Sequence, residues 1–302
     1  MAAVARGRCL PRAWLCRWGP DSPLSPERQP GDPRNPRLAL CSRRAGQGCG
    51  RHYRAALCAE LKQPLAIEEV ASRPVRPHET LWQIPERVPL REAATLPVSY
   101  GTAVLALEHR AHTRPGETVL VTAAAGATGL AVIDVATNVL HAQVIAAAGS
   151  DEKCKLAMQK GAQSVVNYSR GSLKEAVRTL VGSAGVNVAI DTVGGDVFLE
   201  ALRSLAWEGR IVVVGFAGGT IASVPANLLL LKNVSAMGLY WSRYKEQNFP
   251  VFSRTLSSAL QYCQQGRIQP HIGAVFKLEE VNDAFLHVIQ RKSTGKVLIS
   301  LK

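Results

Sequence analysis

A glycine-rich turn, Ala123-Ala-Ala-Gly126-Ala-Thr-Gly129, is the group of residues best suited to bind a ligand. It follows an apolar run over residues 118–122 that is typical of a buried strand, and it precedes an apolar helical pattern. Gly126 would let the backbone approach a pyrophosphate, and Gly129 would let the helix pack closely on the strand. The turn therefore predicts dinucleotide binding, although Ala123 stands where a glycine is usual. A turn that serves packing alone is the alternative.

The next loop bears on which dinucleotide is bound. An NAD site usually has an acid about 20 residues after the glycines, where it binds the ribose hydroxyls. Here the sequence has Ala147-Ala148-Gly149-Ser150, with Lys153 just beyond. A missing acid and a nearby cation favour a 2′-phosphate and hence NADP(H). The alternative makes Ser150 a helix N-cap and Lys153 a solvated side chain.

Two later loops again place glycines after apolar segments. They are Asp191-Thr-Val-Gly-Gly195 and Gly215-Phe-Ala-Gly-Gly219. The backbone of each could approach a nicotinamide, and each could equally be an ordinary tight turn.

Strand patterns alternate with helical patterns from residue 117 onward, which predicts an α/β fold with a doubly wound parallel sheet (a Rossmann fold). Ser172 and Glu175 have the spacing of a capping box at the start of one helix. The ligand loops then lie at the carboxyl ends of the strands. The predicted strands cover residues 118–122, 143–147, 164–166, 186–190, 210–214 and 233–238, and the predicted helices include 127–140, 151–159 and 196–205.

The charge of the chain is concentrated at its start. The formal net charge is +13, and residues 1–54 supply +8 of it through eleven arginines and three acids. An Arg-rich, acid-poor leader is typical of a mitochondrial transit peptide. The alternative is a disordered leader with no targeting function and a cytoplasmic protein. The remaining residues carry only +5, so a nucleic-acid partner is not predicted from charge.

The spacing of the cysteines and the length of the apolar runs indicate neither a metal-binding nor a membrane-spanning protein. The seven cysteines form no Cys-x-x-Cys and no cluster with zinc spacing, so they predict reduced thiols and no metal site. No stretch reaches the roughly 18 apolar residues that a membrane span needs.

Several ordered stretches together resemble the zinc-free quinone oxidoreductases, the zeta-crystallin branch of the medium-chain dehydrogenase/reductase superfamily. The resemblance runs from about residue 80 to residue 302. The stretches are Thr95-Leu-Pro-Val-Ser-Tyr-Gly-Thr-Ala103, Gly116-Glu-Thr-Val-Leu-Val121, the glycine turn, Ala148-Gly-Ser-Asp-Glu-Lys153 and Thr294-Gly-Lys-Val-Leu298.

The resemblance implies metal-free hydride transfer from NADPH to a small-molecule quinone or enone. It also implies a homodimer formed through the sheet edge near Val234–Tyr240. The implied cofactor-binding residues are Thr102, Ala125, Gly126, Ala127, Thr128, Gly129, Gly149, Ser150, Lys153, Tyr168, Gly195, Val214, Gly215, Phe216, Ala217, Leu239 and Arg291.

The chain departs from this family in its substrate-binding domain, a GroES-like barrel whose characteristic segments are missing between Glu79 and Thr80. We expect residues 55–90 and 270–302 to be remnants of the barrel, and residues 91–269 to form the dinucleotide-binding domain. The predicted remnant strands are 57–61, 65–70 and 296–300.

The missing barrel leaves three functions open: an NADPH-dependent quinone or enone reductase, a truncated and inactive NADP(H)-binding fragment, and an RNA-binding protein of the kind reported among relatives of this family. No catalytic residue is assigned. Tyr100 and Tyr240 are the nearest candidates for a proton donor, and each could instead be a packed aromatic residue.

Overall fold

The computed structural model describes residues 52–58, 63–71 and 81–301, in two units that meet near residue 80 in the sequence. The first unit contains an antiparallel pair, β1 (His52–Leu57) and β2 (Ala66–Ala71). The strand predicted over residues 57–61 shares only Leu57 with β1, and its residues 59–61 lie outside the described part of the chain. β1 begins inside the predicted leader. The rest of the leader lies outside the described residues.

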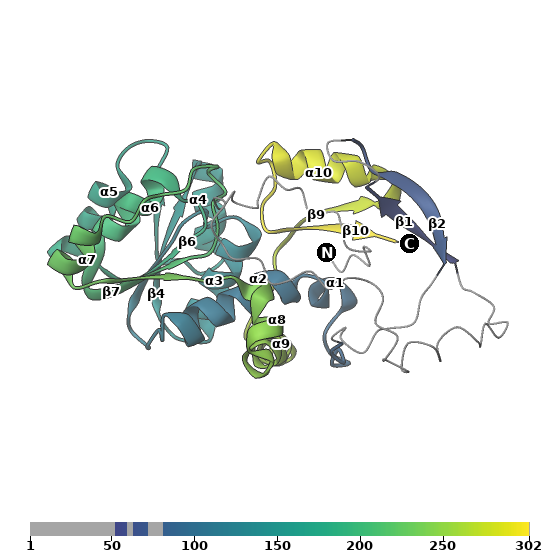
Figure 1. Cartoon of the computed structure of the whole chain (residues 1–302), viewed down its shortest axis with the longest axis horizontal. Helices are drawn as coiled ribbons and strands as arrows, with labels where there is room; N and C mark the ends of the chain where they lie inside the picture. Colours follow the sequence, from purple (N-terminus) through teal and green to yellow (C-terminus); the bar gives the residue numbers. More distant parts are fainter. Residues whose placement is uncertain (1–51, 59–62, 72–80, 302) are drawn as a thin grey trace, which may run out of the picture. The chain divides into compact units, whose positions relative to one another are not determined.

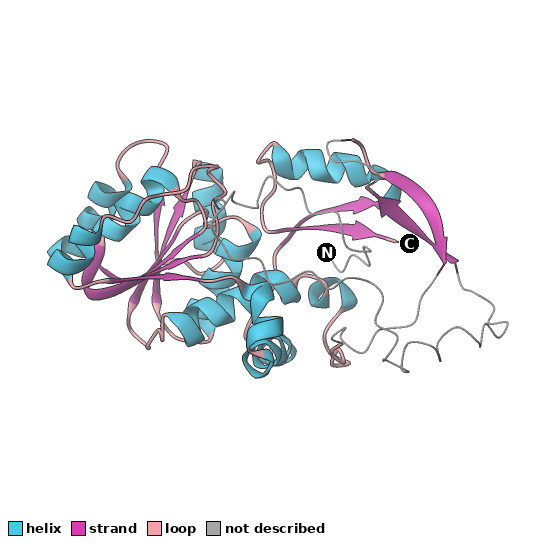
Figure 2. Ribbon diagram, in the orientation of Figure 1, coloured by secondary structure: helices cyan, strands magenta, loops and turns pink. Residues whose placement is uncertain are grey.

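The second unit is built on a parallel six-stranded sheet with the order β5-β4-β3-β6-β7-β8 (Figures 1 and 2). The chain enters at β3 in the middle, winds outward to β5, and returns to wind the other way from β6. This confirms the predicted doubly wound sheet, and it places the switch point between β3 and β6. The strands are β3 (Thr118–Val121), β4 (Gln143–Ala148), β5 (Ser164–Asn167), β6 (Val186–Asp191), β7 (Leu205–Val213) and β8 (Ser235–Gly238).

Helices connect the strands and cover both faces of the sheet (Figure 1). The α-helices are α1 (Leu90–Ala93), α2 (Leu96–Val104), α3 (Ala127–Asn138), α4 (Asp151–Gln159), α5 (Leu173–Val181), α6 (Gly195–Arg203), α7 (Ala226–Lys232), α8 (Tyr244–Gln247), α9 (Phe249–Gln264) and α10 (Val281–Ile289). The other helical segments are a π-helix, η2 (Leu105–Arg110), and three 3₁₀ helices, η3 (Gly182–Ala184), η4 (Trp241–Arg243) and η5 (Leu278–Glu280).

Alternate residues of the central strands fill two separate cores. Val119 and Val121 of β3 belong to the core under α2, α3 and α9, whereas Leu120 belongs to the core under α5 and α6. Each of these three side chains is fully buried. Burying one such aliphatic side chain contributes about 1.5–3 kcal/mol, so the continuous apolar strand is stabilised from both faces.

One helix is shorter than the prediction, because Leu205 opens β7 instead of closing α6. Opposite this point the register shifts. Val186 of β6 faces Leu205, but Val188 faces Arg210. The extra residues of β7 form an irregularity in which Glu208 has a φ of 58°. The helical periodicity of residues 196–205 contains no sign of this bulge.

The Ser172 half of the predicted capping box of α5 is confirmed, since the Ser172 hydroxyl oxygen accepts a hydrogen bond from the Glu175 N–H at 3.3 Å. The Glu175 carboxylate pairs with Lys174 and Arg178. The Glu200 carboxylate accepts from the Ser172 hydroxyl at 3.0 Å and from the Lys174 N–H at 2.9 Å. The start of α5 is thereby held to α6, its neighbour on this face.

The last part of the chain forms a small parallel pair, β9 (Ile272–Lys277) and β10 (Lys296–Ser300), joined through α10. The predicted strand 296–300 is confirmed. Across the part of the chain that the structure describes, no helix is both long enough and apolar enough to cross a membrane.

Candidate cofactor site

The glycine turn lies at the carboxyl end of β3 and leads directly into α3. Gly126 is the N-cap of α3, and Ala127, Thr128 and Gly129 form its first turn. The Gly126 N–H donates to the Ala123 carbonyl at 2.9 Å, and the Ala124 N–H donates to the Ala147 carbonyl of β4 at 3.0 Å. The turn is therefore held to β4, and the N-terminus of α3 lies at the carboxyl ends of the strands, where a pyrophosphate would bind.

Ala123 and Gly129 show how tightly this turn is folded. Ala123 has a φ of 46°, the left-handed conformation that a glycine usually supplies at this point. A Cβ on Gly129 would lie 2.5 Å from the Ala123 carbonyl oxygen and 2.7 Å from the Ala124 Cα. Gly129 is thus required for close packing of α3 on the turn, as the sequence predicted.

The segment before β10 pairs with the turn. Gly295 forms a parallel bridge with Gly126, and the Gly295 N–H donates to the Ala125 carbonyl at 2.9 Å. Gly295 has a φ of 54°, and a Cβ there would lie 2.4 Å from the His271 carbonyl oxygen, so only glycine fits. Sequence analysis included Gly295 in a family motif without assigning it this contact.

The residues expected to distinguish NADP(H) from NAD(H) gather at the carboxyl ends of β4 and β5. Gly149 follows β4, and a Cβ on it would lie 3.6 Å from the Tyr168 ring. Ser150 caps α4, accepting a 3.4 Å hydrogen bond from the Lys153 N–H, so the capping alternative for Ser150 holds. The Lys153 ammonium donates to the Arg291 carbonyl at 2.9 Å. It is therefore held to the chain beyond α10.

The electrostatics of this corner favour an anion. Burial raises the pKa of the Tyr168 phenol, and the positive charge of Arg291 acts in the opposite direction. The acid nearest to the end of β4 is Asp151, whose carboxylate accepts a 2.7 Å hydrogen bond from the Asn167 amide and pairs with Arg170. These partners hold the pKa of Asp151 below its ordinary value. Asp151 is thus already engaged.

A polar network that sequence analysis missed joins β3 to β6 at the switch point. The fully buried Thr122 hydroxyl donates to the Asp191 carboxylate at 2.6 Å, and that carboxylate also accepts from the Gly194 N–H at 2.9 Å. The Thr192 N–H donates to the Thr122 hydroxyl oxygen at 3.0 Å. Burial has the larger effect and raises the pKa of Asp191 above its ordinary value, although the hydrogen bonds from these donors act in the opposite direction. The sequence signal that could have revealed this network is Asp191, a single acid that directly follows the apolar run 186–190.

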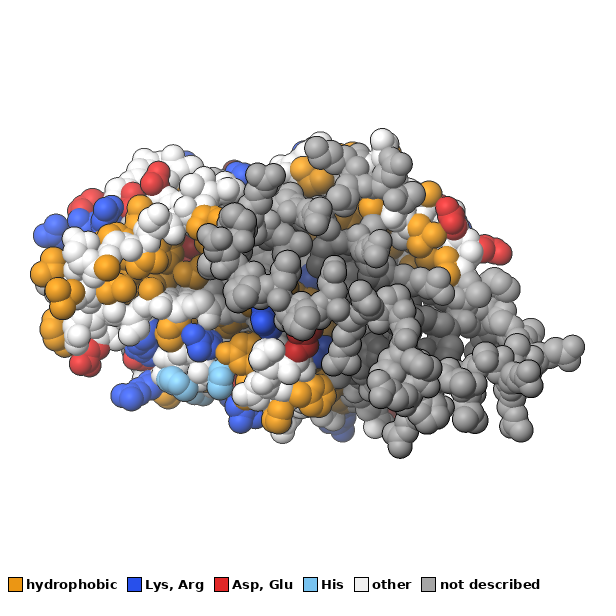
Figure 3. Space-filling view, in the orientation of Figure 1, with side chains coloured by type: hydrophobic (Ala, Val, Ile, Leu, Met, Phe, Trp, Pro, Cys, Tyr) orange, Lys and Arg blue, Asp and Glu red, His pale blue; other side chains and the backbone are white. Residues whose placement is uncertain are grey.

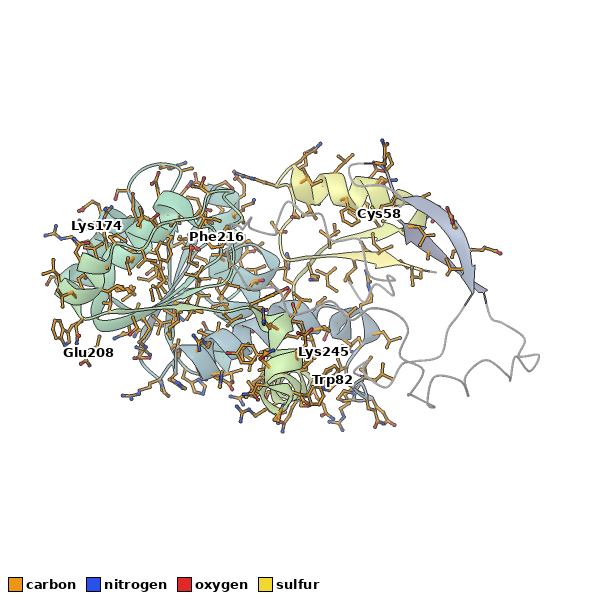
Figure 4. All side chains as sticks on the ribbon, in the orientation of Figure 1. Cys58, Trp82, Lys174, Glu208, Phe216 and Lys245 are labelled. Atoms are coloured by element: carbon orange, nitrogen blue, oxygen red, sulfur yellow. The ribbon has the colours of Figure 1, made fainter. Side chains whose placement is uncertain are left out.

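The loops after β6 and β7 pack against each other, which supports the tight-turn alternative for their glycines. A Cβ on Gly194 would lie 2.5 Å from the Thr220 carbonyl oxygen, and one on Gly218 would lie 2.9 Å from the Val193 carbonyl oxygen. Gly195 opens α6 with a φ of 53°. The predicted contacts Val214, Gly215, Phe216 and Ala217 directly follow the end of β7, and Figure 4 labels Phe216.

Thr102 and Leu239 are both buried, Thr102 in α2 and Leu239 directly after β8. The Leu239 N–H donates to the Val213 carbonyl at 2.9 Å. Trp241 lies next to α2, because a Cβ on Gly101 would lie 2.7 Å from its indole nitrogen. That nitrogen is buried and has no hydrogen-bond partner in the part of the chain that is described. An unsatisfied buried donor beside Gly101 is open to an acceptor atom of a ligand.

The structure places the two tyrosines named as possible proton donors in different surroundings. Tyr100 is buried and donates to the Asp134 carboxylate at 2.6 Å. Burial, then the negative charge of Asp134, raises the pKa of the Tyr100 phenol well above its ordinary value. Tyr240 is 66% exposed.

Comparison with known proteins gives one family match and close relatives. Residues 127–258 match the family model described as zinc-binding dehydrogenase. Within residues 52–58, 63–71 and 81–301, no three His, Cys, Asp or Glu residues lie together as metal ligands would.

The chain is 62% identical to quinone oxidoreductase-like protein 2 of Bos taurus, over 99% of this chain and 100% of the relative. It is 32% identical to quinone oxidoreductase of Mus musculus, over 74% of this chain and 66% of the relative. The structure resembles that of the quinone oxidoreductase from Thermus thermophilus, which was also determined in complex with NADPH. The TM-score is 0.67 and the identity 33%, over 82% of this chain and 76% of that one.

The bovine alignment also shows a difference in length. It extends over 374 positions, whereas this chain has 302 residues, so at least 72 aligned positions have no counterpart here. The parallel sheet, the glycine turn and the identity to these relatives agree with one another. The chain belongs to the quinone oxidoreductase-like protein 2 family, an oxidoreductase family of the medium-chain dehydrogenase/reductase superfamily.

Proposed function

We propose that the protein binds NADP(H) and transfers hydride to a quinone or an enone. The observation that carries the cofactor assignment is the corner formed by Gly149, Lys153, Tyr168 and Arg291, where cations are present and the nearest acid is engaged. A ribose with free hydroxyls calls for a carboxylate acceptor, whereas a 2′-phosphate calls for cations.

Each part of the cofactor has candidate partners at the carboxyl ends of the parallel strands. The N-terminus of α3, with Gly126 as its cap, would bind the pyrophosphate. Lys153 and Arg291 would bind the 2′-phosphate. Thr102 and the backbone around Leu239 would border the nicotinamide, whose reduced form supplies the hydride. The remaining predicted contacts, in the loops after β6 and β7, would complete this border.

A second candidate function is cofactor binding without turnover. Fast hydride transfer needs an acceptor held against the nicotinamide in a site that excludes water. At least 72 positions of the bovine relative have no residue here, and sequence analysis assigns the gap to the substrate-binding domain. Loss of that wall would leave the cofactor bound and the acceptor unpositioned.

One experiment on the full chain separates these candidates. Binding of NADPH is measured by calorimetry, and its oxidation is followed by absorbance with a panel of ortho-quinones, para-quinones and enones. Binding with oxidation supports the reductase, and binding without oxidation supports the second candidate. Absence of binding refutes both. The Lys153→Ala variant should bind NADPH at least about tenfold more weakly, since a charge-assisted contact is lost. Lys155→Ala, on the same helix and exposed, is the matched control.

We also propose a homodimer that forms through β8. This strand ends the described sheet, and the adjacent helix α7 exposes Leu230 and Leu231 by 80% and 71%. Hydrophobic side chains gather over this end of the molecule, at the left of Figure 3. An uncovered edge strand beside apolar side chains favours pairing with a second copy. Sedimentation should show a dimer for the natural chain and a monomer for Leu230→Lys. A Leu286→Lys control on α10 should remain dimeric, and a monomeric natural chain would refute the proposal.

The Arg-rich leader supports a proposal of mitochondrial import. The full chain with a C-terminal fluorescent tag should co-localise with a mitochondrial marker, and a version without residues 1–51 should be cytosolic. A diffuse cytosolic signal from the full chain would contradict import.

A further inference from the structure

A pocket of about 320 Å³ lies beside the start of α2 and is not explained by the cofactor site. Its walls come from five parts of the second unit: the segment before α2 that contains Trp82 and Ala94, the start of α2, the η4–α8 segment, α9 and β10. Its volume is within the range of small-molecule sites. The lining residues are Trp82, Ala94, Pro97, Val98, Trp241, Ser242, Lys245, Phe252, Leu256 and Lys296. We name it the α2–α9 pocket.

Three aromatic rings form one side of the α2–α9 pocket. Phe252 lies between two tryptophans, with ring centroids 4.7 Å from Trp241 and 5.7 Å from Trp82. Such a cluster offers flat apolar surfaces at fixed angles, which suit a planar aromatic ligand better than a flexible aliphatic one.

Two lysines give the pocket its charge. Lys296 and Lys245 both line it, and no carboxylate of a described residue lies within 4 Å of either ammonium. The polar contact found for the Lys296 ammonium is a long one, 3.5 Å to the Ser99 hydroxyl. Burial lowers the pKa of Lys296, and no nearby acid opposes this effect. Figure 4 shows Trp82 and Lys245 close together beside α9.

A partly buried ammonium without an acidic partner is costly, because its lost hydration is not replaced. An anionic group of a ligand would replace it. A carboxylate attached to an aromatic ring satisfies both features of the pocket, since its ring meets the aromatic side chains and its charge meets the lysines. A neutral aromatic compound would satisfy only the first.

We propose that the α2–α9 pocket binds a planar aromatic carboxylate, with its ring against Trp241 and Phe252 and its carboxylate on Lys296. This binding requires neither the cofactor nor turnover, so it is independent of the proposed reductase activity.

The test compares two probes of the same ring system by calorimetry on the full chain without NADPH: 2-naphthoate, which is anionic, and 2-naphthylmethanol, which is neutral. The natural chain should bind 2-naphthoate at least about tenfold more tightly, the effect of one hydrogen bond to a charged group. Equal affinities, or no binding of 2-naphthoate, would overturn the proposal.

Single substitutions test whether Lys296 causes the preference for the anionic probe. Lys296→Met should remove the preference for 2-naphthoate and change the affinity for 2-naphthylmethanol less than about threefold. Lys277→Met, on the neighbouring strand β9 and outside the pocket, removes the same charge and should keep the preference. A preference that persists in Lys296→Met would overturn the assignment. Val98→Trp, which fills the pocket from an exposed position of α2, should weaken both probes and provides a test if Lys296→Met does not fold. Unchanged binding in Val98→Trp would also overturn the proposal.

Discussion

Replacing Gly129 by alanine tests whether the turn and α3 are packed as tightly as the structure indicates. The new Cβ would lie 2.5 Å from the Ala123 carbonyl oxygen and 2.7 Å from both the Cα and the carbonyl oxygen of Ala124. All three atoms belong to the backbone of the turn. No side-chain rotation relieves these contacts, so the helix must move away from the turn by roughly 1 Å to reach ordinary van der Waals distance.

The magnitude follows from two opposing effects. Overpacking of this kind costs about 1–3 kcal/mol, and alanine returns up to about 1 kcal/mol through its better helix propensity. We therefore expect the free energy of unfolding to fall by about 1–2 kcal/mol, which corresponds to a lower melting temperature by about 2–8 °C. Movement of α3 also withdraws its N–H groups from the pyrophosphate, so NADPH binding should weaken at least about tenfold.

Thermal melting followed by circular dichroism and NADPH calorimetry measure both effects. Gly171→Ala is the matched control, because its Cβ would have nothing within 4 Å and its φ is not in the left-handed region. The control should stay within about 0.5 kcal/mol of the natural chain. If Gly129→Ala melts like Gly171→Ala and binds NADPH as tightly, the reasoning about the turn is wrong.

Two further changes test local conformation and charge. Ala123→Gly should raise the free energy of unfolding by about 0.5–1 kcal/mol. Relief of the left-handed alanine stabilises the folded state by about 1–2 kcal/mol, and the greater flexibility of glycine in the unfolded chain offsets part of this. A lower melting temperature would contradict this prediction. Glu117 is bound by Arg210 at 2.8 Å, and although burial raises its pKa, the hydrogen bonds from Arg210 and Arg114 lower the pKa below its ordinary value. That stabilisation is present above about pH 4.3 and is lost as pH falls through the lowered pKa. Glu117→Gln should therefore cost about 1–3 kcal/mol in denaturant unfolding at pH 7 and less at pH 3, and an equal cost at both pH values would refute the charge assignment.

The sheet could be predicted from the sequence because its signal is local. Each buried parallel strand is a short apolar run, and each is followed by a helical period or a glycine loop. The chain order of these runs, together with the right-handed connection, then limits the topology to few choices. The capping of α5 was likewise contained in two residues, Ser172 and Glu175.

The misses arise where distant segments meet. The pairing of Gly295 with Gly126 joins residues far apart in sequence, and no local pattern of either predicts it. The early start of β7 depends on a bulge against β6, which overrides the helical pattern of residues 196–205. The α2–α9 pocket needs residues from five separate parts of the chain, so only the folded chain shows that no described carboxylate pairs with Lys296.

The left-handed Ala123 shows a third kind of limit. Sequence analysis identified it as a substitute for the first glycine of the turn, but residue type alone could not show that the backbone keeps the glycine conformation. The turn retains its φ because Ala124 is hydrogen-bonded to β4 and Gly126 to Ala123 itself. Surrounding hydrogen bonds thus impose a conformation that alanine disfavours.

The most direct test of the account is a calorimetric titration of the full chain with NADPH and, separately, with NADH. The cations around Tyr168 and the engaged carboxylate of Asp151 predict a dissociation constant for NADPH at least about tenfold below that for NADH. Equal affinities, tighter binding of NADH, or no binding of either dinucleotide would contradict the assignment of an NADP(H) site to the carboxyl ends of these strands.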